Sequence, residues 1–233
     1  MIDLSFTCTQ VGSVAHAAGP TLVFRLRVTA PESVSVHAIA LRCQLRIEPL
    51  RRTYRDSEAE ALSDLFGDRS RWGSSLLPIQ FAHASIMVPA FTGHIDVDLH
   101  VPCTYDLDLA ATRYFEAVDE GGIPMRLLFS GTAFAGPGGF QVEPVSWDRE
   151  AAAQVPVAVW RGMFEEHFPG CGWLRLPRAT MNALVDYRSS RALPSWEATI
   201  ESLLGDQTAD RSPVAAARVA IPAVSRAARG SEA

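Results

Sequence analysis

Alternation of apolar and polar residues dominates the first 150 residues and predicts β-strands. Apolar side chains take every second position in residues 22–29, and residues 37–47 repeat the same period of two. This period places one set of side chains on a buried face and the other toward solvent. Further strands are expected near residues 3–8, 79–88, 94–101, 125–134 and 140–146, with residues 136–139 as the turn between the last two. Short strands separated by turns predict a β-sandwich.

The two clearest strands are predicted to pair as a hairpin, because Pro31-Glu32-Ser33 has turn composition and lies between them. Arg25 and Arg27 then project outward from one strand, and Arg42 and Arg46 project outward from its partner. A charged, solvated sheet face is the ordinary explanation. The alternative is an arginine surface that binds an acidic partner, either another protein or the acidic middle segment of a second copy.

Helical periodicity takes over in a few places. Ser57 and Glu60 have capping-box spacing, and residues 108–120 form a second candidate helix within the strand-rich part. Apolar residues then follow a helical period near 157–168, 177–187 and after Ser195. The expected fold is mainly β, a β-sandwich core with a short α-helical C-terminal extension. Its predicted parts are a sandwich at residues 1–150, a helical extension packed on it at 151–204, and a disordered tail at 205–233.

Charge and composition exclude several classes of function. The net charge is −5, and all 21 basic residues are arginine, so a lysine nucleophile is ruled out. Residues 56–146 carry most of the acidic excess, and a chain without a basic surplus is not expected to bind nucleic acid. No basic, apolar leader and no stretch of about 18 apolar residues is visible, which predicts a cytoplasmic protein without a membrane span. The four scattered cysteines are expected to be reduced.

The candidate catalytic and metal-binding residues are weak. The chain has no nucleophile elbow and no phosphate-binding loop. Asp96 and Asp98 share one strand face, which a solvated sheet explains as well as a catalytic pair does. The remaining candidates are His94, His100 and Cys103, whose spacing does not suit a metal site, and His167 with Cys171. We therefore predict no catalytic residue, no cofactor and no metal ion, although enzymatic activity stays open.

Aromatic residues gather after the strand-rich part. Four of the five tryptophans lie between residues 147 and 196. They can pin the helices onto the sandwich, or they can line a docking groove, since tryptophan and arginine dominate interface hot spots. Trp160, Phe164 and Trp173 are the candidate docking residues.

Several runs make the chain resemble a bacterial domain-of-unknown-function family, number 6084. The resemblance covers about residues 3–204 and is carried by residues 25–28, 37–44, 80–83, 101–106, 157–160 and 172–176. Members of that family are often encoded beside nickel–iron hydrogenase genes, which implies an accessory role in making or holding a hydrogenase. The resemblance carries over no catalytic residue. The chain has Arg178-Ala179-Thr180 where an acid is expected in the middle position, which weakens any role for an acid there.

The function predicted from these observations is that of a non-catalytic accessory or interaction protein. Its partner would be a protein, with a hydrogenase subunit or maturation factor as the one that the resemblance implies. The first alternative is a chaperone-like binder of immature chains, which requires a broad exposed apolar surface. Further alternatives are a sandwich that binds a small molecule and an enzyme of unknown class. The oligomeric state is left open.

Overall fold

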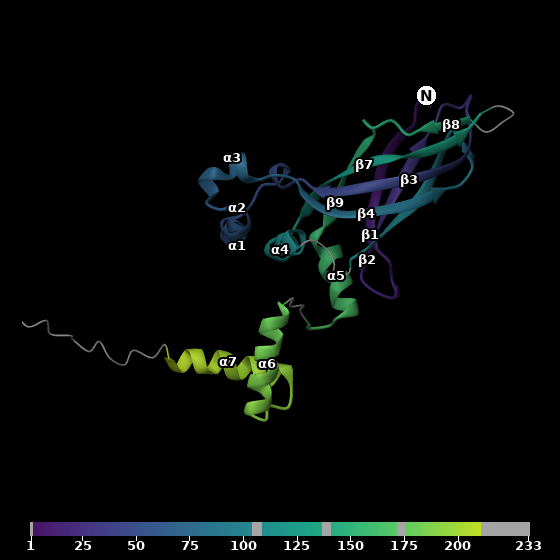
Figure 1. Ribbon diagram of the computed structural model, residues 1–233. Helices are drawn as coiled ribbons and strands as arrows, with labels where there is room; N and C mark the ends of the chain where they lie inside the picture. Colours follow the sequence, from purple (N-terminus) through teal and green to yellow (C-terminus); the bar gives the residue numbers. More distant parts are fainter. Residues whose placement is uncertain (1, 104–108, 137–140, 172–175, 211–233) are drawn as a thin grey trace, which may run out of the picture. The chain divides into compact units, whose positions relative to one another are not determined.

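The structure, a computed structural model, describes residues 2–103, 109–136, 141–171 and 176–210. The chain divides into two units, Met1–Trp173 and Leu174–Ala233 (Figure 1). The first unit contains the strands and the second contains the last two helices. The fold is mainly β, as the alternation of apolar residues predicts.

The smaller sheet of the first unit has three antiparallel strands in the order β1-β2-β6. They are β1 (Ser5–Ser13), β2 (Thr21–Thr29) and β6 (His94–Pro102). The central strand β2 shows the predicted period, because Leu22, Phe24, Leu26 and Val28 are buried while Arg25 is exposed.

The larger sheet is built on its two longest strands, β3 and β7, which lie side by side. Its antiparallel strands are β3 (Ser35–Ile47), β4 (Ile79–Val88), β5 (Phe91–Thr92), β7 (Gly122–Ala135), β8 (Gln141–Pro144) and β9 (Glu150–Pro156). Strand β4 lies on the far side of β3, and β8 and β9 follow one another along the far side of β7. The predicted helical extension beginning at residue 151 is therefore wrong at its start, because residues 150–156 form a strand.

The predicted hairpin between residues 22–29 and 37–47 is wrong. Strand β2 pairs with β1 and β6, whereas β3 pairs with β4, β5 and β7, so the two strands belong to different sheets. Two half-buried strands can bury their apolar faces side by side or face to face, and the local pattern is the same in both cases. The connection after β2 crosses from one sheet to the other, with the amide of Ala30 donating to the carbonyl oxygen of Gly93.

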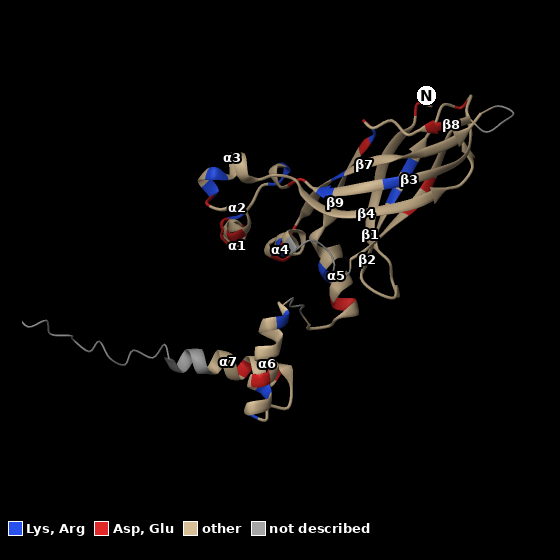
Figure 2. Ribbon diagram, in the orientation of Figure 1, with Lys and Arg blue, Asp and Glu red and all other residues tan. Residues whose placement is uncertain are grey.

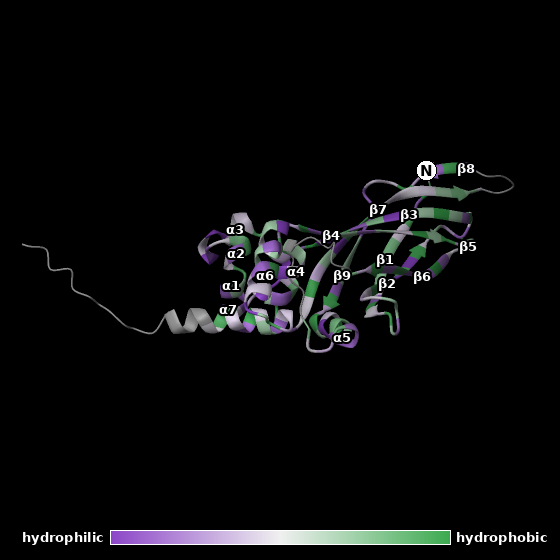
Figure 3. Ribbon diagram, turned by 60° about the horizontal axis from the view of Figure 1, so that its bottom comes forward, coloured by the Kyte–Doolittle hydropathy of each residue, from purple (hydrophilic) through white to green (hydrophobic). Residues whose placement is uncertain are grey.

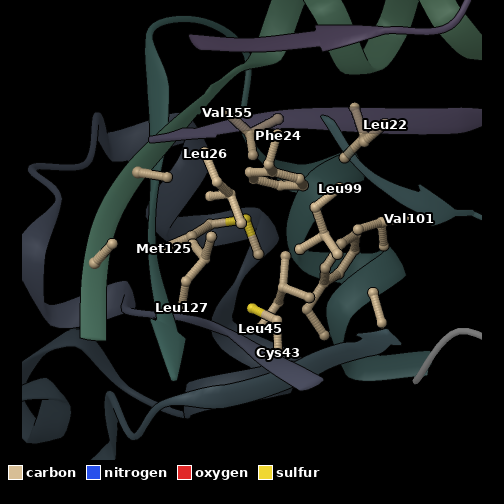
Figure 4. Close-up of a cluster of buried hydrophobic side chains, with 14 of the residues drawn as sticks. Leu22, Phe24, Leu26, Cys43, Leu45, Leu99, Val101, Met125, Leu127 and Val155 are labelled. Carbon is tan, nitrogen blue, oxygen red and sulfur yellow. The ribbon is translucent and has the colours of Figure 1, made fainter. Parts of the chain in front are cut away.

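The core lies between the two sheets. Figure 4 shows side chains of β2 and β6 meeting those of β3, β7 and β9. The labelled members are Leu22, Phe24, Leu26, Cys43, Leu45, Leu99, Val101, Met125, Leu127 and Val155, all at most 2 % exposed. This contact between the inner faces of two sheets is the packing of a β-sandwich.

Helices near one end of the first unit interrupt the strands. Between β3 and β4 the chain forms η1 (Pro49–Arg51), α1 (Asp56–Ala61), α2 (Ser63–Phe66), η2 (Arg69–Arg71) and α3 (Trp72–Ser75). The helix α4 (Leu109–Ala117) precedes β7, and α5 (Val157–His167) follows β9. Both inserted helices and the helix near 157–168 were predicted. The cap of α1 is Arg55, two residues before the predicted Ser57, and Glu58 rather than Glu60 accepts the capping hydrogen bond from the amide of Arg55.

The second unit contains a helical pair, α6 (Arg178–Ser190) and α7 (Trp196–Asp210). The predicted cap is confirmed, since the Ser195 hydroxyl accepts from the amide of Ala198 at 3.1 Å. The predicted tail boundary at Gly205 is wrong, because α7 continues to Asp210; the rest of that tail lies outside the described residues. Among the helices of the described chain, none is long and apolar enough to span a membrane.

Candidate interaction surface

The outer face of the smaller sheet neutralises its own arginines. Arg25 donates two hydrogen bonds to Asp98, at 2.9 and 3.0 Å, and Arg27 donates two to Asp96, both at 2.8 Å. The strand register sets each arginine directly opposite its aspartate. These bidentate hydrogen bonds hold the pKa of both carboxyl groups below the ordinary value. The two aspartates that were candidates for a catalytic pair are therefore engaged in ion pairs.

The outer face of the larger sheet differs in the partners of its arginines. Arg42 and Arg46 lie there, on β3, so the structure does not bring them together with Arg25 and Arg27. Arg46 contacts the side chain of Gln44, and neighbouring Arg126 pairs with Glu150. Within the described residues, Arg42 and Arg46 have no carboxylate within 4 Å. Figure 2 marks basic positions in blue on β3 of this sheet.

Arg42 lies in a hollow of about 600 Å³ on this outer face. Its direct neighbours across the strands are Ser85 on β4 and Ser130 on β7. The hollow is lined by the short side chains of both strands together with Ile86 and Met87, and Met87 is 63 % exposed. Short side chains on both sides of a long cationic one leave the guanidinium accessible to a binding partner.

Gly131 shapes the same hollow. It has φ +148°, and a Cβ built there would lie 2.1 Å from the carbonyl oxygen of Ala40. Only glycine lets β7 approach the backbone of β3 so closely. Position 131, which lies opposite the buried Leu41, therefore has no room for a side chain.

A turn at the edge of β7 presents Trp147, whose side chain is 91 % exposed. The turn joins β8 to β9 and lies beside Ser130, because the amide of Val145 donates to Gly131 and the amide of Phe129 donates to Arg149. The amide of Arg149 closes the turn on Ser146, and its side chain donates to Asp3 at 2.8 Å. The side chain of Trp147 is therefore exposed to solvent on a turn that several hydrogen bonds hold in place.

The predicted aromatic docking residues have other surroundings. Trp160 is 5 % exposed. It stacks on Phe115 with 4.0 Å between ring centroids, and the ring of Phe164 lies tilted against it at 4.6 Å. Trp160 thus serves the core, which is the first of the two interpretations given to these tryptophans, and Phe164 is half-buried against it. Trp173 lies outside the described residues.

A buried ion pair joins the helical insertion to the sandwich. Arg52 donates to Glu58 at 2.8 Å and to the carbonyl oxygens of Gly122 and Glu120, and the Glu58 side chain is 1 % exposed. Burial by itself raises the pKa of Glu58, but hydrogen bonds from the amides of Arg55 and Asp119 and from Arg52 outweigh it, so the pKa is lowered. The network fixes the fold at one end of the sandwich.

The thiols and imidazoles give no support to a catalytic site. Burial raises the pKa of the Cys43 and Cys103 thiols to about 12. Both ring nitrogens of His167 lie within hydrogen-bonding distance of backbone carbonyls, those of Met163 and Ala17, so neither is directed at Cys171. In the described ranges, no three His, Cys, Asp or Glu side chains come close enough to hold a metal ion. The absence of a metal stays a prediction that elemental analysis of untagged protein can test.

Sequence reasoning missed two features of the larger sheet. Trp147 was counted with the aromatic group but was not chosen as a candidate docking residue, although its neighbours Pro144, Ser146 and Asp148 have the composition of an exposed turn. The hollow depends on which strands flank Arg42, and no local signal specifies that.

Comparison with known proteins gives a family and no function. The model of a family of unknown function, DUF6084, matches residues 1–212. No curated protein matches. The solution structure of a protein described as late embryogenesis abundant is similar at 16 % identity and a TM-score of 0.30, over 66 % of this chain and 72 % of that one. A β-glucosidase from Kluyveromyces marxianus is similar at 6 % identity and a TM-score of 0.22, over 66 % of this chain and 15 % of that one. Neither similarity supports an inference about function.

Proposed function

We propose that this chain, which belongs to the DUF6084 family of unknown function, is a non-catalytic interaction protein that binds a protein partner through the outer face of its larger sheet. The observation that carries the proposal is Trp147. An indole 91 % exposed on an anchored turn gains a large apolar burial on binding. Because the turn is already ordered, it loses little conformational entropy when a partner covers it.

The partner proposed is a subunit or maturation factor of a nickel–iron hydrogenase. What supports this choice is the gene neighbourhood of the family that the chain resembles, and the cytoplasmic location expected from its sequence suits such a role. The interaction surface is defined independently of the partner's identity by Trp147, Met87 and Arg42.

Site-specific photo-crosslinking tests the proposal. A benzophenone amino acid replaces Trp147 in the full chain, and a matched variant carries it at Leu77, which is 66 % exposed and lies outside the larger sheet. Irradiation in native lysate should give one discrete adduct from position 147 and none from position 77, and mass spectrometry should identify a hydrogenase subunit or maturation factor. Identical adducts from both positions, or none from position 147, would refute the interaction surface.

A chaperone-like binder is the second candidate, because the helical pair of the second unit exposes apolar residues. Among those at least a third exposed are Met181, Val185, Trp196, Ile200 and Leu204, and Figure 3 shows apolar positions along both helices. A chaperone should bind a hydrophobic dye strongly and suppress aggregation of an unrelated client. A specific interaction protein should do neither.

A further inference from the structure

Arg42 and Arg46 differ from the other arginines on the central strands of the two outer faces, because among the described residues neither has a carboxylate within 4 Å. Arg25 and Arg27 each have an aspartate directly opposite, and Arg126 pairs with Glu150 and Glu48. Arg42 has serines on both sides instead. In the part of the chain that the structure describes, no carboxylate pairs with Arg42, and a cation flanked by two hydroxyl groups leaves electrostatic attraction and hydrogen-bonding capacity for an anion supplied from outside.

The chemistry of the hollow suits a carboxylate. A guanidinium presents parallel N–H groups that match the two oxygens of a carboxylate. Neighbouring strands lie about 5 Å apart, so the hydroxyls of Ser85 and Ser130 flank Arg42 closely enough to donate to the same group. Met87, on the outer face opposite Ala40, adds an apolar margin.

Arg46 provides a second position along the same strand. It lies four residues after Arg42 on β3, on the same face, which is about 13 Å at the rise of a strand. An extended peptide has the same rise, so acidic side chains four residues apart can meet both arginines while the residue between them meets Gln44. Charge complementarity and spacing thus select an extended acidic segment.

We propose that the hollow around Arg42 binds a carboxylate carried by an extended acidic segment of the partner protein, with a second carboxylate four residues away at Arg46. This inference rests on the proposed function and names the partner's chemistry. The acidic side chains would be exposed in the free partner and would pair with Arg42 and Arg46 in the complex.

The test is an NMR titration of the ¹⁵N-labelled full chain with the capped peptide Ser-Glu-Ser-Leu-Ser-Glu-Ser. At low salt, the amides of Arg42, Ser85 and Ser130 should shift together. A peptide with both glutamates replaced by glutamine should bind at least fivefold more weakly, and Arg42→Gln should cause a similar loss. Arg25→Gln is the matched control, because Arg25 is paired on the other sheet and its loss should leave the titration unchanged.

Three results would overturn the inference. These are shifts that fall away from the three residues, equal binding of the glutamine peptide, and shifts at the same residues that depend on protein concentration without peptide, which would make a second copy the occupant. The fates of the two proposals are separable. If position 147 crosslinks a partner while the peptide fails, only the acidic specificity is wrong; if the peptide binds and no crosslink forms, the proposed function is wrong.

Discussion

At the scale of single residues, the arginines of this protein have three different environments. Arg52 is largely covered and pairs with the buried Glu58. Arg25 and Arg27 are exposed in bidentate pairs, and Arg42 is exposed without a carboxylate among the described residues. The same side chain therefore supports the fold at one place and is available for binding at another. Burial and the opposite strand decide between these roles.

The buried pair leads to a stability prediction. Glu58→Ala should lower the free energy of unfolding by roughly 3 kcal/mol, because it leaves the charge of Arg52 buried without its partner. Glu58→Gln should cost less, since its one amide oxygen can still accept from the Asp119 amide and from Arg52, although its NH2 group then faces the amide of Arg55. Glu60→Ala, an exposed change in the same helix, is the control and should be nearly neutral. Urea unfolding measures all three, and equal effects at positions 58 and 60 would contradict the role of the network.

The pKa of Glu58 sets how the difference in free energy of unfolding between the native protein and Glu58→Gln depends on pH. Its pKa in the folded protein is lowered from a value near about 4.3 in the unfolded chain. A lowered carboxyl pKa contributes stability that is present above the unfolded value and is lost as the pH falls through the folded value. The stability gap between the native protein and Glu58→Gln should therefore be constant near neutral pH and shrink below about pH 4. A gap that widens on acidification would contradict the assignment.

At the scale of elements, the larger sheet depends on the approach of β7 to β3 at Gly131. The positive φ and the short distance to Ala40 leave no room for a side chain.

Two glycine-to-alanine changes should shift the free energy of unfolding in opposite directions. Gly131→Ala should destabilise the protein by at least about 2 kcal/mol, because the new Cβ collides with backbone. Gly162→Ala in α5 should stabilise it by about 0.5–1 kcal/mol, since its Cβ meets nothing within 4 Å and alanine favours a helix. Thermal unfolding of both variants shows whether each one is less or more stable than the native protein. A Gly131→Ala variant of unchanged stability would show that β7 can move away from β3.

At the scale of the whole molecule, the division of the chain predicts which part folds alone. The sandwich core and the aromatic stack around Trp160 both lie within Met1–Trp173. A core of this size can support an independent domain.

A fragment ending at Trp173 should therefore stay soluble and unfold in one cooperative transition within about 5 °C of the full chain. Two shorter truncations should also have their melting temperatures compared. Truncation after Gly205 removes the end of α7, whereas truncation after Asp210 keeps the whole helix. Circular dichroism melts measure these fragments. Insoluble protein from the Trp173 fragment would show that the second unit contributes to the stability of the first.

Much of the fold follows from the sequence because its signals are local. The alternation in β2, β3, β4 and β6 and the cap at Ser195 are each contained in a few consecutive residues. Strand β9 was missed because its alanines have weak strand preference, although every second residue is buried. The candidate site was predicted less well, since Arg42 and Arg46 were grouped with residues of the other sheet and Trp147 was not among the candidate docking residues.

By itself, the sequence determined the mainly β class, the inward and outward faces of each strong strand and the outward direction of the arginines, because a period of two depends only on the residues of one strand. Tertiary structure alone decided which strands are neighbours, and thereby which arginines meet a carboxylate. Asp96 and Asp98 lie about 70 residues from Arg27 and Arg25 and still neutralise them, while Arg42 has Ser85 and Ser130 opposite it on the two neighbouring strands. Strand pairing is a non-local choice made by burying two sheet faces together, so it is not encoded in any one segment.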